Sequence, residues 1–490
     1  MATRVFGLLC AINLLNFIDR GVIPGAPIEF QAFVQSSYGV SPEHVSVYLG
    51  LLASAFIASY SVSICVFGYL SITRRPFDLA AAGLFVWVIA LVLCGLAKPL
   101  NSFHLLLLGR LISGIGESSF HATTPAFIDE FAPRGSRTLW LGCFYAGMPA
   151  GTAMGYSYGS VFAQTVGWDV GFYVLGLAML PLAVACWRCI PAQFNHPLRD
   201  DMPKSHAVQD TDDDATTTAD DDDVGHLLPT TAPSPTSVVA EVTTIIRDPL
   251  FATASLGLAA FAFTTAGLGA FAPSILIGYG LLDARTAPTV FGALVVVTGV
   301  VGSPIGGLLL DRHCRSRPDD VPFRIYAAAV QMLLLLVLGV GCLLLSLACV
   351  ASPVGFFGLQ TLGLFALFAA QAATTLVVLL AAARAHRGLA MALNTFVLHA
   401  LGDVPSPLVL GALKDYWAPH CGSVEQADGT SVLDPRCRLE SPGLTKTLLF
   451  AYLWLLLAVG SWSATVVVAR RRLRRSSGGS LVPCPRSSIL

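Results

Sequence analysis

Twelve long apolar stretches, six on each side of one acidic loop, constrain this chain more than any other feature of its sequence. A run of about 20 apolar residues is long enough to cross the hydrocarbon core of a bilayer. Backbone in lipid must satisfy its own hydrogen bonds, and continuous apolar segments of this length do so as helices rather than as barrel strands. The chain is 54% hydrophobic and only 12% charged, which is about half the charge of a typical soluble protein. The sequence therefore predicts an all-α integral membrane protein.

The predicted spans divide evenly into two halves. They are residues 5–28, 45–70, 78–97, 102–130, 137–162 and 170–190, followed by 249–279, 286–310, 323–349, 354–383, 387–415 and 444–469. This division predicts two six-helix bundles, residues 1–190 and 249–469, with a linker at 191–248 and a basic tail at 470–490. The linker holds the acidic run Asp210 to Asp223, which lacks the apolar residues needed to fold. We expect a disordered cytosolic linker, with a partner-binding or regulatory role as the alternative.

The placement of arginine predicts the orientation, because cytosolic loops carry an excess of basic residues. One side of the membrane would hold Arg74, Arg75, Arg134, Arg137, Arg312, Arg315, Arg317, Arg324, Arg384, Arg387 and Arg470 to Arg472. The other side holds far fewer basic residues, so we expect both termini in the cytosol. Cys421 and Cys437 then share a loop on the non-cytosolic side. They form a disulfide if that compartment is oxidising and otherwise remain two free thiols.

Small residues predict where helices approach closely. Gly147, Gly151, Gly155 and Gly159 recur every four residues on the fifth span. This spacing gives a continuous ridge without side chains, which is typical of tight helix contacts in membranes. We interpret the ridge as structural first, and as a surface on which helices can also slide.

Charged residues inside the spans are the candidate functional site, because a charge at the bilayer centre costs roughly 2.5 kcal/mol or more. The first span carries Asn13, Asn16, Asp19 and Arg20, and the fourth carries Arg110, Glu117 and His121. Helical spacing puts Glu117 one turn from His121, and Arg20 is a second candidate partner for Glu117 across the bundle. On the eleventh span, His399 and Asp403 lie one turn apart, before Pro405.

Two interpretations of these charges stay open. In the first, a carboxylate takes up and releases a proton and thereby controls an arginine contact, since burial raises the pKa of a carboxyl and a nearby arginine lowers it. In the second, the charges are buried ion pairs that only fix how the helices align. We see no cluster with metal-ligand spacing, no nucleotide motif and no nucleophilic serine in a recognisable setting, so we expect no metal, no cofactor and no enzymatic activity.

The sequence resembles the Spinster branch of the major facilitator superfamily. The matching motifs, spread over most of both halves, are Asn16-Phe-Ile-Asp-Arg20, Gly109-Arg-Leu-Ile-Ser-Gly-Ile-Gly-Glu-Ser-Ser-Phe120, Phe144-Tyr-Ala-Gly-Met-Pro-Ala-Gly151, Pro304-Ile-Gly-Gly-Leu-Leu-Leu-Asp-Arg312 and His399-Ala-Leu-Gly-Asp-Val-Pro-Ser-Pro407. The resemblance implies twelve helices in two pseudo-symmetric bundles with alternating access around a central cavity. It also implies a lipid-like substrate, such as a lysophospholipid or a sphingoid phosphate, and proton coupling through Asp19, Arg20 and Glu117.

One motif departs from the family pattern. The loop after the second span usually reads Gly-x-Leu-x-Asp-Arg, but here Ile72 and Thr73 stand where Asp and Arg belong. The second-half copy keeps Asp311 and Arg312. Because the resemblance implies that this aspartate helps to hold the cytosolic face shut, we expect a conformational latch in the second half alone.

The leading prediction is a proton-linked secondary transporter of an amphiphile, acting as a monomer that contacts the bilayer, its small amphiphilic substrate and protons, and no nucleic acid. Mostly apolar spans with few polar groups suit such a substrate; Thr264, Thr265, Gln360, Gln371 and Thr374 are candidate polar lining from the second half. The alternatives are a transporter of a small polar nutrient or organic anion, and a membrane receptor or scaffold without transport. The plasma membrane and an endolysosomal membrane both fit.

Overall fold

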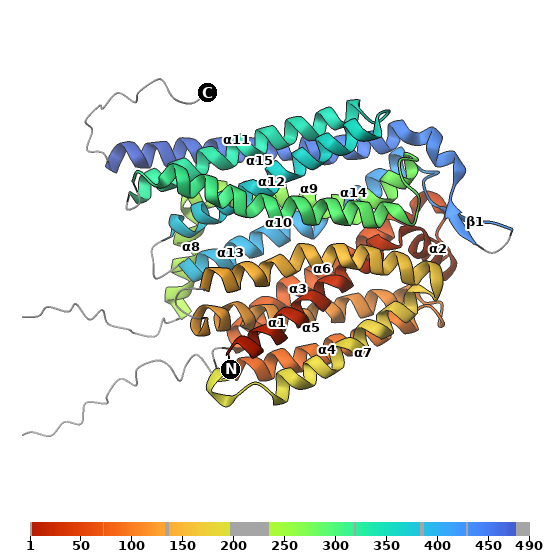
Figure 1. Ribbon diagram of the computed structural model, residues 1–490, viewed down its shortest axis with the longest axis horizontal. Coiled ribbons are helices and arrows are strands. Elements are labelled where there is room, and N and C mark those ends of the chain that lie inside the picture. Colours follow the sequence, from red (N-terminus) through yellow and green to blue (C-terminus); the bar gives the residue numbers. More distant parts are fainter. Residues whose placement is uncertain are drawn as a thin grey trace, which may run out of the picture.

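Long helices that run side by side make up nearly all of the computed structural model (Figure 1). It describes residues 2–71, 73–132, 137–196, 235–317, 320–382, 387–427 and 430–476. The first half contains α1 (Ala2–Gly25), α2 (Pro27–Tyr38), α3 (Val45–Leu70), α4 (Pro76–Leu96), α5 (Phe103–Phe131), α6 (Arg137–Thr165) and α7 (Trp168–Arg188). The second half contains α8 (Pro235–Arg247), α9 (Pro249–Gly278), α10 (Thr286–Cys314), α11 (Val321–Ala348), α12 (Pro353–Ala381), α13 (Arg387–Leu398), α14 (Pro405–Trp417) and α15 (Ser441–Ser476).

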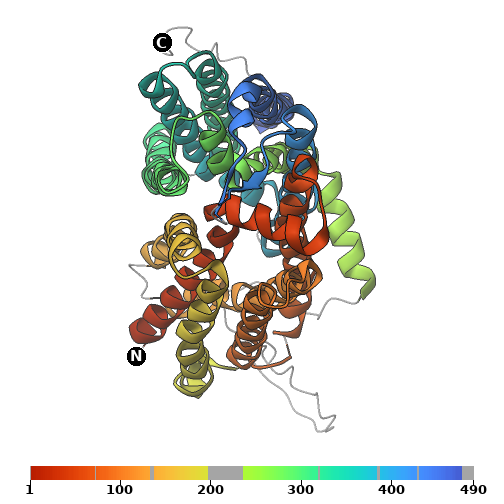
Figure 2. The same cartoon turned by 90° about the vertical axis from the view of Figure 1, so that its right-hand side faces the viewer.

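The helices form two bundles, which appear as two lobes when the molecule is viewed from one end (Figure 2). In the first bundle α1 packs on α6, and α4 packs between α5 and α7. In the second bundle α9 packs on α15, and α12 packs between α10 and α11. The predicted all-α fold with twelve spans is confirmed. Among the described residues, ten helices are apolar enough to be recognised as spans from length and composition alone. The other two spans are α5, which carries the buried charges, and the glycine-rich α6.

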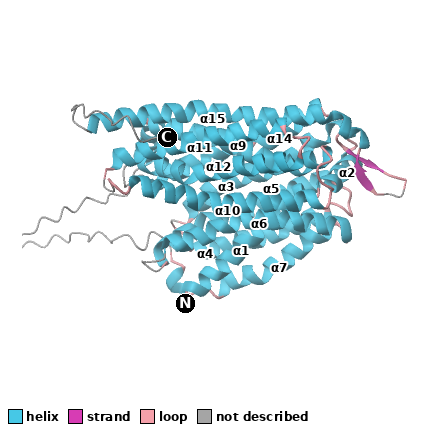
Figure 3. Ribbon diagram, turned by 45° about the horizontal axis from the view of Figure 1, so that its top comes forward, coloured by secondary structure: helices cyan, strands magenta, loops and turns pink. Residues whose placement is uncertain are grey.

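Helix α2 and two short strands lie together at one end of the bundles (Figure 3). A two-stranded antiparallel hairpin, β1 (Ser423–Glu425) and β2 (Ser431–Leu433), follows α14, and it packs on α2 of the other bundle. Cys421 and Cys437 form a disulfide at the base of this hairpin. We call this the hairpin end; the termini end is the opposite one, where α1 begins and α15 finishes.

The structure differs from the predicted elements at three places. The first span finishes at Gly25 rather than residue 28, because Ala26 leaves the helical conformation and Pro27 starts α2. The predicted tail at 470–490 begins inside a helix, since α15 continues to Ser476. The eleventh span is interrupted by a five-residue π-helical segment, η5 (His399–Asp403), just before Pro405. Proline lacks the N–H that a regular helix needs there.

The predicted linker also contains an element that the sequence analysis missed. Helix α8 occupies residues 235–247, and its Ile245 is buried where α8 packs against α9 and α13. Asp248 then caps α9 by accepting from the backbone N–H of Leu250 at 2.8 Å, and its carboxylate binds Arg472 of α15 at 2.6 Å. The acidic run from Asp210 to Asp223, together with Ile72, Arg134 and Arg384, lies outside the described residues.

Candidate functional site

Helix α1 lies very close to α6. A Cβ atom built on Gly151 would lie 2.6 Å from the Cβ of Phe17, and one built on Gly155 would lie 2.8 Å from the Cα of Gly21. The glycine ridge therefore packs directly against the backbone of α1, as its spacing predicts. This contact holds one side of α1, and α5 faces its polar side.

The first ion pair joins Asp19 of α1 to Arg110 of α5. The Nη1 atom of Arg110 donates to both carboxylate oxygens of Asp19 at 2.9 Å, and the Ser113 hydroxyl donates to Oδ2 at 3.2 Å. The Asp19 side chain is fully buried and that of Arg110 is 4% exposed. Removing one member of a buried pair typically costs about 3–5 kcal/mol, because the other charge is left without a partner. This pair therefore holds α1 and α5 together.

The second ion pair joins Arg20 to Glu117 on α5, a contact that the sequence analysis had named. Arg20 donates to Oε1 of Glu117 from Nη2 at 2.6 Å and from Nε at 3.0 Å. The Glu117 side chain is fully buried, whereas that of Arg20 is 23% exposed. The other carboxylate oxygen, Oε2, has no hydrogen-bond partner among the described residues. Glu117 therefore has one oxygen bound to arginine and a second that is free to carry a proton.

A short chain of contacts continues from Glu117 to α6. The Nδ1 atom of His121 lies 3.6 Å from Oε1 of Glu117, and its Nε2 lies 3.0 Å from Oδ1 of Asn13. Asn13 in turn donates to the backbone oxygen of Phe144 at 2.7 Å. The side-chain atoms of Asn16 are buried without a partner among the described residues. His121 and Asn13 thus connect the carboxylate to α6, while Asn16 takes no part in this network.

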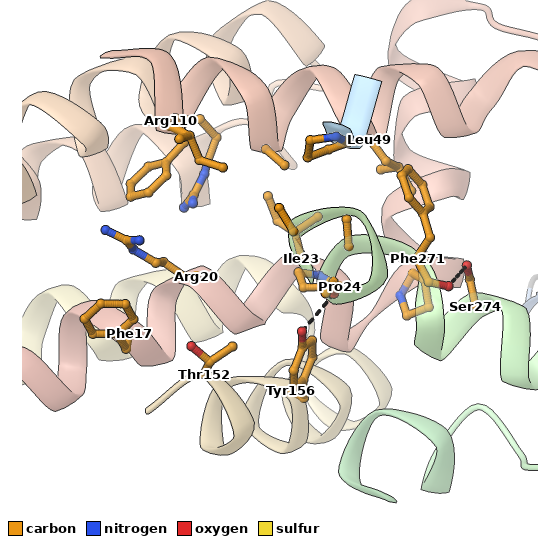
Figure 4. Close-up of a pocket in the computed structure, with 18 residues that line it drawn as sticks. Phe17, Arg20, Ile23, Pro24, Leu49, Arg110, Thr152, Tyr156, Phe271 and Ser274 are labelled. Atoms are coloured by element: carbon orange, nitrogen blue, oxygen red, sulfur yellow. Dashed lines mark hydrogen bonds between the residues drawn. The ribbon is translucent and has the colours of Figure 1, made fainter. Parts of the chain in front are cut away.

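Next to these pairs lies a cavity of about 220 Å³ between the two bundles (Figure 4). Arg20 and Arg110 supply its charged wall, and Thr152, Tyr156 and Ser274 add a few hydroxyl groups. The rest of the lining is apolar: Phe17, Ile23, Pro24, Pro27, Leu49, Ala53, Phe56, Ile57, Ala266, Gly269, Ala270, Phe271 and Pro407. The cavity therefore offers a cationic wall beside a predominantly hydrophobic volume.

None of the five residues predicted as polar lining from the second half lines this cavity, to which α9 contributes other residues. Thr264 donates to the backbone oxygen of Ala451 at 2.7 Å, and Gln360 donates to the Tyr452 hydroxyl at 2.8 Å. Both side chains are buried inside the second bundle. A sequence shows that a polar residue lies on a span, but it does not show which neighbouring helix that residue faces.

The third predicted cluster, His399 and Asp403, lies in the π-helical segment η5 of the second bundle. Nδ1 of His399 and Oδ2 of Asp403 are 2.7 Å apart. The ring of His399 meets the ring of Tyr60 on α3 edge-on, with centroids 5.8 Å apart, and Tyr60 also contacts His121 at 5.8 Å. Single π-helical turns are frequent at functional sites. The structure therefore places one tyrosine between the titratable groups of the two bundles.

The family profile described as Major Facilitator Superfamily matches residues 9–407. The chain belongs to this superfamily. The resemblance to its Spinster branch is also confirmed by curated relatives. The probable sphingolipid transporter spinster homolog 2 of Arabidopsis thaliana is 29% identical over 427 residues, which cover 84% of this chain and 81% of the relative. The sphingosine-1-phosphate transporter SPNS2 of Mus musculus is 27% identical over 416 residues, which cover 82% of this chain and 68% of the relative.

A solved structure has the same fold. It is a bacterial homologue of the human lysosomal transporter Spinster in an inward-facing and unoccupied conformation, with a TM-score of 0.71 at 18% identity. The alignment covers 96% of this chain and 98% of that chain. At this identity the likeness establishes the architecture alone.

In this superfamily member, contacts between the two bundles gather in the half of the molecule toward the hairpin end. Near that end α3 packs on α14, where a Cβ on Gly50 would overlap the backbone of Pro407. On the other side α6 packs on α10, where Ser157 donates to Thr289 at 3.1 Å and Arg285 donates to Gln164 at 2.8 Å. The hairpin end is therefore closed by direct contact between the two bundles.

Two charged residues of α14 strengthen this closure, and the sequence analysis missed their role. Asp415 accepts from the backbone N–H groups of Ser46 at 3.1 Å and Val47 at 2.9 Å, in the first turn of α3. Lys414 is fully buried and donates to the Ser46 hydroxyl at 2.9 Å and to the backbone oxygen of Cys421 at 3.0 Å. A carboxylate at a helix N-terminus satisfies free N–H groups and opposes the positive end of the helix dipole. The sequence signal for this role was a lysine next to an aspartate at the end of the predicted span 387–415.

Replacing Asp415 with alanine is expected to open the hairpin end more often, because the first turn of α3 then loses both acceptor oxygens. Loss of such a cap costs about 0.5–2 kcal/mol, which corresponds to about 2- to 30-fold in the open population. With the free cysteines replaced by serine, a Leu49→Cys reporter in the cavity, labelled by a membrane-impermeant maleimide, should react faster by this factor. The same reporter with Asp169→Ala, which removes the exposed pair with Lys98, is the control. Equal rates in both would show that Asp415 does not hold this end shut.

The predicted latch residues Asp311 and Arg312 lie at the other end of the molecule. Both are exposed near the C-terminus of α10, and with Arg315 and Arg324 they line an open groove between α10 and α11. The described residues provide neither with an ion-pair partner. Their role as a latch stays a prediction.

Proposed function

We propose that the chain is a secondary transporter that moves a lipid-like amphiphile by alternating access. The observation that carries the proposal is the cavity itself: an apolar volume between the bundles, with Arg20 and Arg110 in one wall. An acyl or sphingoid chain suits the apolar part, and an anionic head group suits the arginines. Closure at the hairpin end by Asp415 supports a cavity that reaches the two sides of the membrane in turn.

The relatives support the chemical class of the substrate. The Arabidopsis thaliana relative is named as a probable sphingolipid transporter, and the Mus musculus relative as a sphingosine-1-phosphate transporter. We propose a lysophospholipid or a sphingoid phosphate for this chain, because each joins a single hydrocarbon chain to an anionic group.

We further propose that a proton on Glu117 drives the cycle. An ionised Glu117 holds Arg20 at 2.6 Å, so the guanidinium is occupied by the protein itself. Protonation of Glu117 removes that negative charge, and its free Oε2 oxygen can carry the proton. Arg20 then becomes available to an anionic head group in the cavity. Proton uptake and substrate binding are thereby coupled through one guanidinium.

The proposal includes an orientation. The termini end faces the cytosol, because it collects the arginines of α10, α11 and α15, and the disulfide-bonded hairpin lies on the opposite, oxidising side. Closure at the hairpin end then describes a cavity that is shut from the non-cytosolic side. We propose that a single chain suffices, since the cavity is formed within one chain, in the plasma membrane or an endolysosomal membrane.

The test is uptake of labelled lysophospholipid and sphingosine-1-phosphate into proteoliposomes, with and without an imposed pH gradient. The proposal expects uptake above that of empty liposomes and a further increase with the gradient. Uptake that ignores the gradient would reject proton coupling and leave lipid transport standing. Failure to move either lipid, with protein correctly inserted, would reject the lipid substrate.

A further inference from the structure

Three aromatic rings surround the guanidinium of Arg20. Its Cζ atom lies 4.5 Å from the ring centroid of Phe17, 5.0 Å from that of Phe56 and 4.9 Å from that of Tyr60. Phe17 precedes Arg20 by one turn of α1, and Phe56 and Tyr60 are one turn apart on α3. A cation within about 6 Å of a ring centroid is attracted by the negative face of the ring. Two helices thus supply one aromatic cage, defined here as Phe17, Phe56 and Tyr60.

The cage lies where the cavity meets the Arg20–Glu117 ion pair. Phe17, Phe56 and Arg20 all line the cavity, whereas Glu117 is fully buried behind it. Figure 4 shows Phe17 and Arg20 on α1, with the side chain of Arg110 near that of Arg20 at the same end of the cavity. The three rings lie around the guanidinium, and its carboxylate partner lies on α5. The exposed part of the Arg20 side chain faces the cavity.

The two cavity arginines differ in how firmly their carboxylates hold them. Arg110 binds both oxygens of Asp19, contacts one ring among the described residues, that of Phe56 at 4.6 Å, and is 4% exposed. Arg20 binds one oxygen of Glu117 and is 23% exposed. Arg20 is therefore the arginine that can exchange its partner while still facing the cavity.

We infer that the aromatic cage keeps the Arg20 guanidinium at the cavity wall when Glu117 no longer binds it, so that an anionic head group takes the place of the carboxylate. This inference rests on the proposed transport of an amphiphile and adds three positioning residues that set a preference for anionic head groups. Arginine side chains are long and flexible, and a guanidinium stacked on rings loses less freedom when it binds an anion. The cage therefore makes Arg20 a prepared anion site.

Other charged and titratable groups surround the cage. They are Glu117, His121 and Arg110 on α5, Asp19 on α1, and His399 on η5, which contacts the ring of Tyr60. The cage itself requires none of them to change protonation. The Glu117→Gln variant, which mimics the neutral carboxyl, therefore isolates the rings at a single pH.

The experiment measures equilibrium binding of labelled oleoyl lysophosphatidic acid and of neutral glycerol mono-oleate to purified Glu117→Gln protein. Adding Phe56→Leu should weaken binding of the anionic lipid by about 2- to 30-fold, the range of one cation–π contact. Phe271→Leu is the matched control, because Phe271 lines the same cavity and is equally buried but contacts no guanidinium in the described structure. The ring-retaining variant Phe56→Tyr should bind the anionic lipid like its Glu117→Gln parent.

The cage is supported if Phe56→Leu affects the anionic lipid alone and Phe271→Leu affects both lipids alike. Equal weakening of both lipids by Phe56→Leu would overturn it, because loss of apolar surface alone would then explain the result. Failure of the Glu117→Gln protein to bind the anionic lipid would overturn it as well. This assay measures binding and does not depend on transport. Absence of lipid flux in proteoliposomes would therefore reject the proposed function, whereas the binding result alone tests the aromatic cage.

Discussion

Replacing Glu117 with glutamine is expected to abolish the increase in uptake that the pH gradient produces, while the protein still folds and inserts. The amide has nearly the same shape but cannot gain or lose a proton, so the pH gradient has nothing to act on at this position. Arg20 loses its carboxylate but keeps its contacts with three rings and its partial exposure to the cavity. The loss of one partner should therefore cost less stability here than in a fully buried pair.

Exchange of labelled for unlabelled lipid at equal pH separates coupling from structure. Under the proposed function, the Glu117→Gln variant keeps this exchange, because binding and reorientation no longer wait for a proton. If the ion pair only aligns the helices, exchange and thermal stability should fall together with uptake. That second pattern would remove Glu117 from the coupling mechanism and leave the fold unaffected.

Replacing Asp19 with asparagine should act differently, although it too should abolish pH-driven uptake. Arg110 would keep its charge at 4% exposure without a carboxylate, at a cost of about 3–5 kcal/mol. Thermal unfolding should therefore begin at a lower temperature for this variant than for Glu117→Gln. Asp169→Asn is the control, because it removes a carboxylate from the partly exposed pair with Lys98, where the expected cost is about 1 kcal/mol or less.

Helical periodicity predicts which residues of this site are neighbours on one helix, and it does not predict their partners on another helix. It places Glu117 one turn from His121, and the structure brings both together with Arg20. It does not reveal that Arg110 binds Asp19, because that pairing depends on how α5 is rotated against α1. Residues sharing a face can be recognised from one helix, whereas the partner across an interface follows from packing.

The elements of the fold also separate into those that the sequence predicts and those that it does not. Span number and approximate position follow from runs of apolar residues, since the bilayer sets the length that each helix needs. Helices α2 and α8 and the β1–β2 hairpin are too short or too polar to be read from apolar runs of spanning length. Asp415 was missed for a related reason: a charge at the end of a span is ordinarily a solvated residue, and only the contact with α3 reveals its role.

The glycine ridge makes a second strong prediction, because it determines whether α1 can reach its place at all. An alanine Cβ at Gly155 would lie 2.8 Å from the Cα of Gly21 and would also overlap the backbone oxygen of Ile18. Both are backbone atoms, so relief requires α1 and α6 to move apart rather than a side chain to rotate. Overpacking of this kind typically costs about 1–3 kcal/mol, and here it would also displace Asp19 and Arg20.

Gly155→Ala is therefore expected to lower the thermal unfolding temperature and to reduce uptake, even with every charged residue intact. Gly460→Ala is the matched control, because Gly460 lies within α15 and a Cβ there meets nothing within 4 Å. Alanine is the better helix former by about 1 kcal/mol, so the control should unfold at the same or a higher temperature. Equal unfolding temperatures in the two variants would show that α1 and α6 tolerate separation. In that case close packing would not be what positions the ion pairs, and the ridge would serve movement between the helices instead.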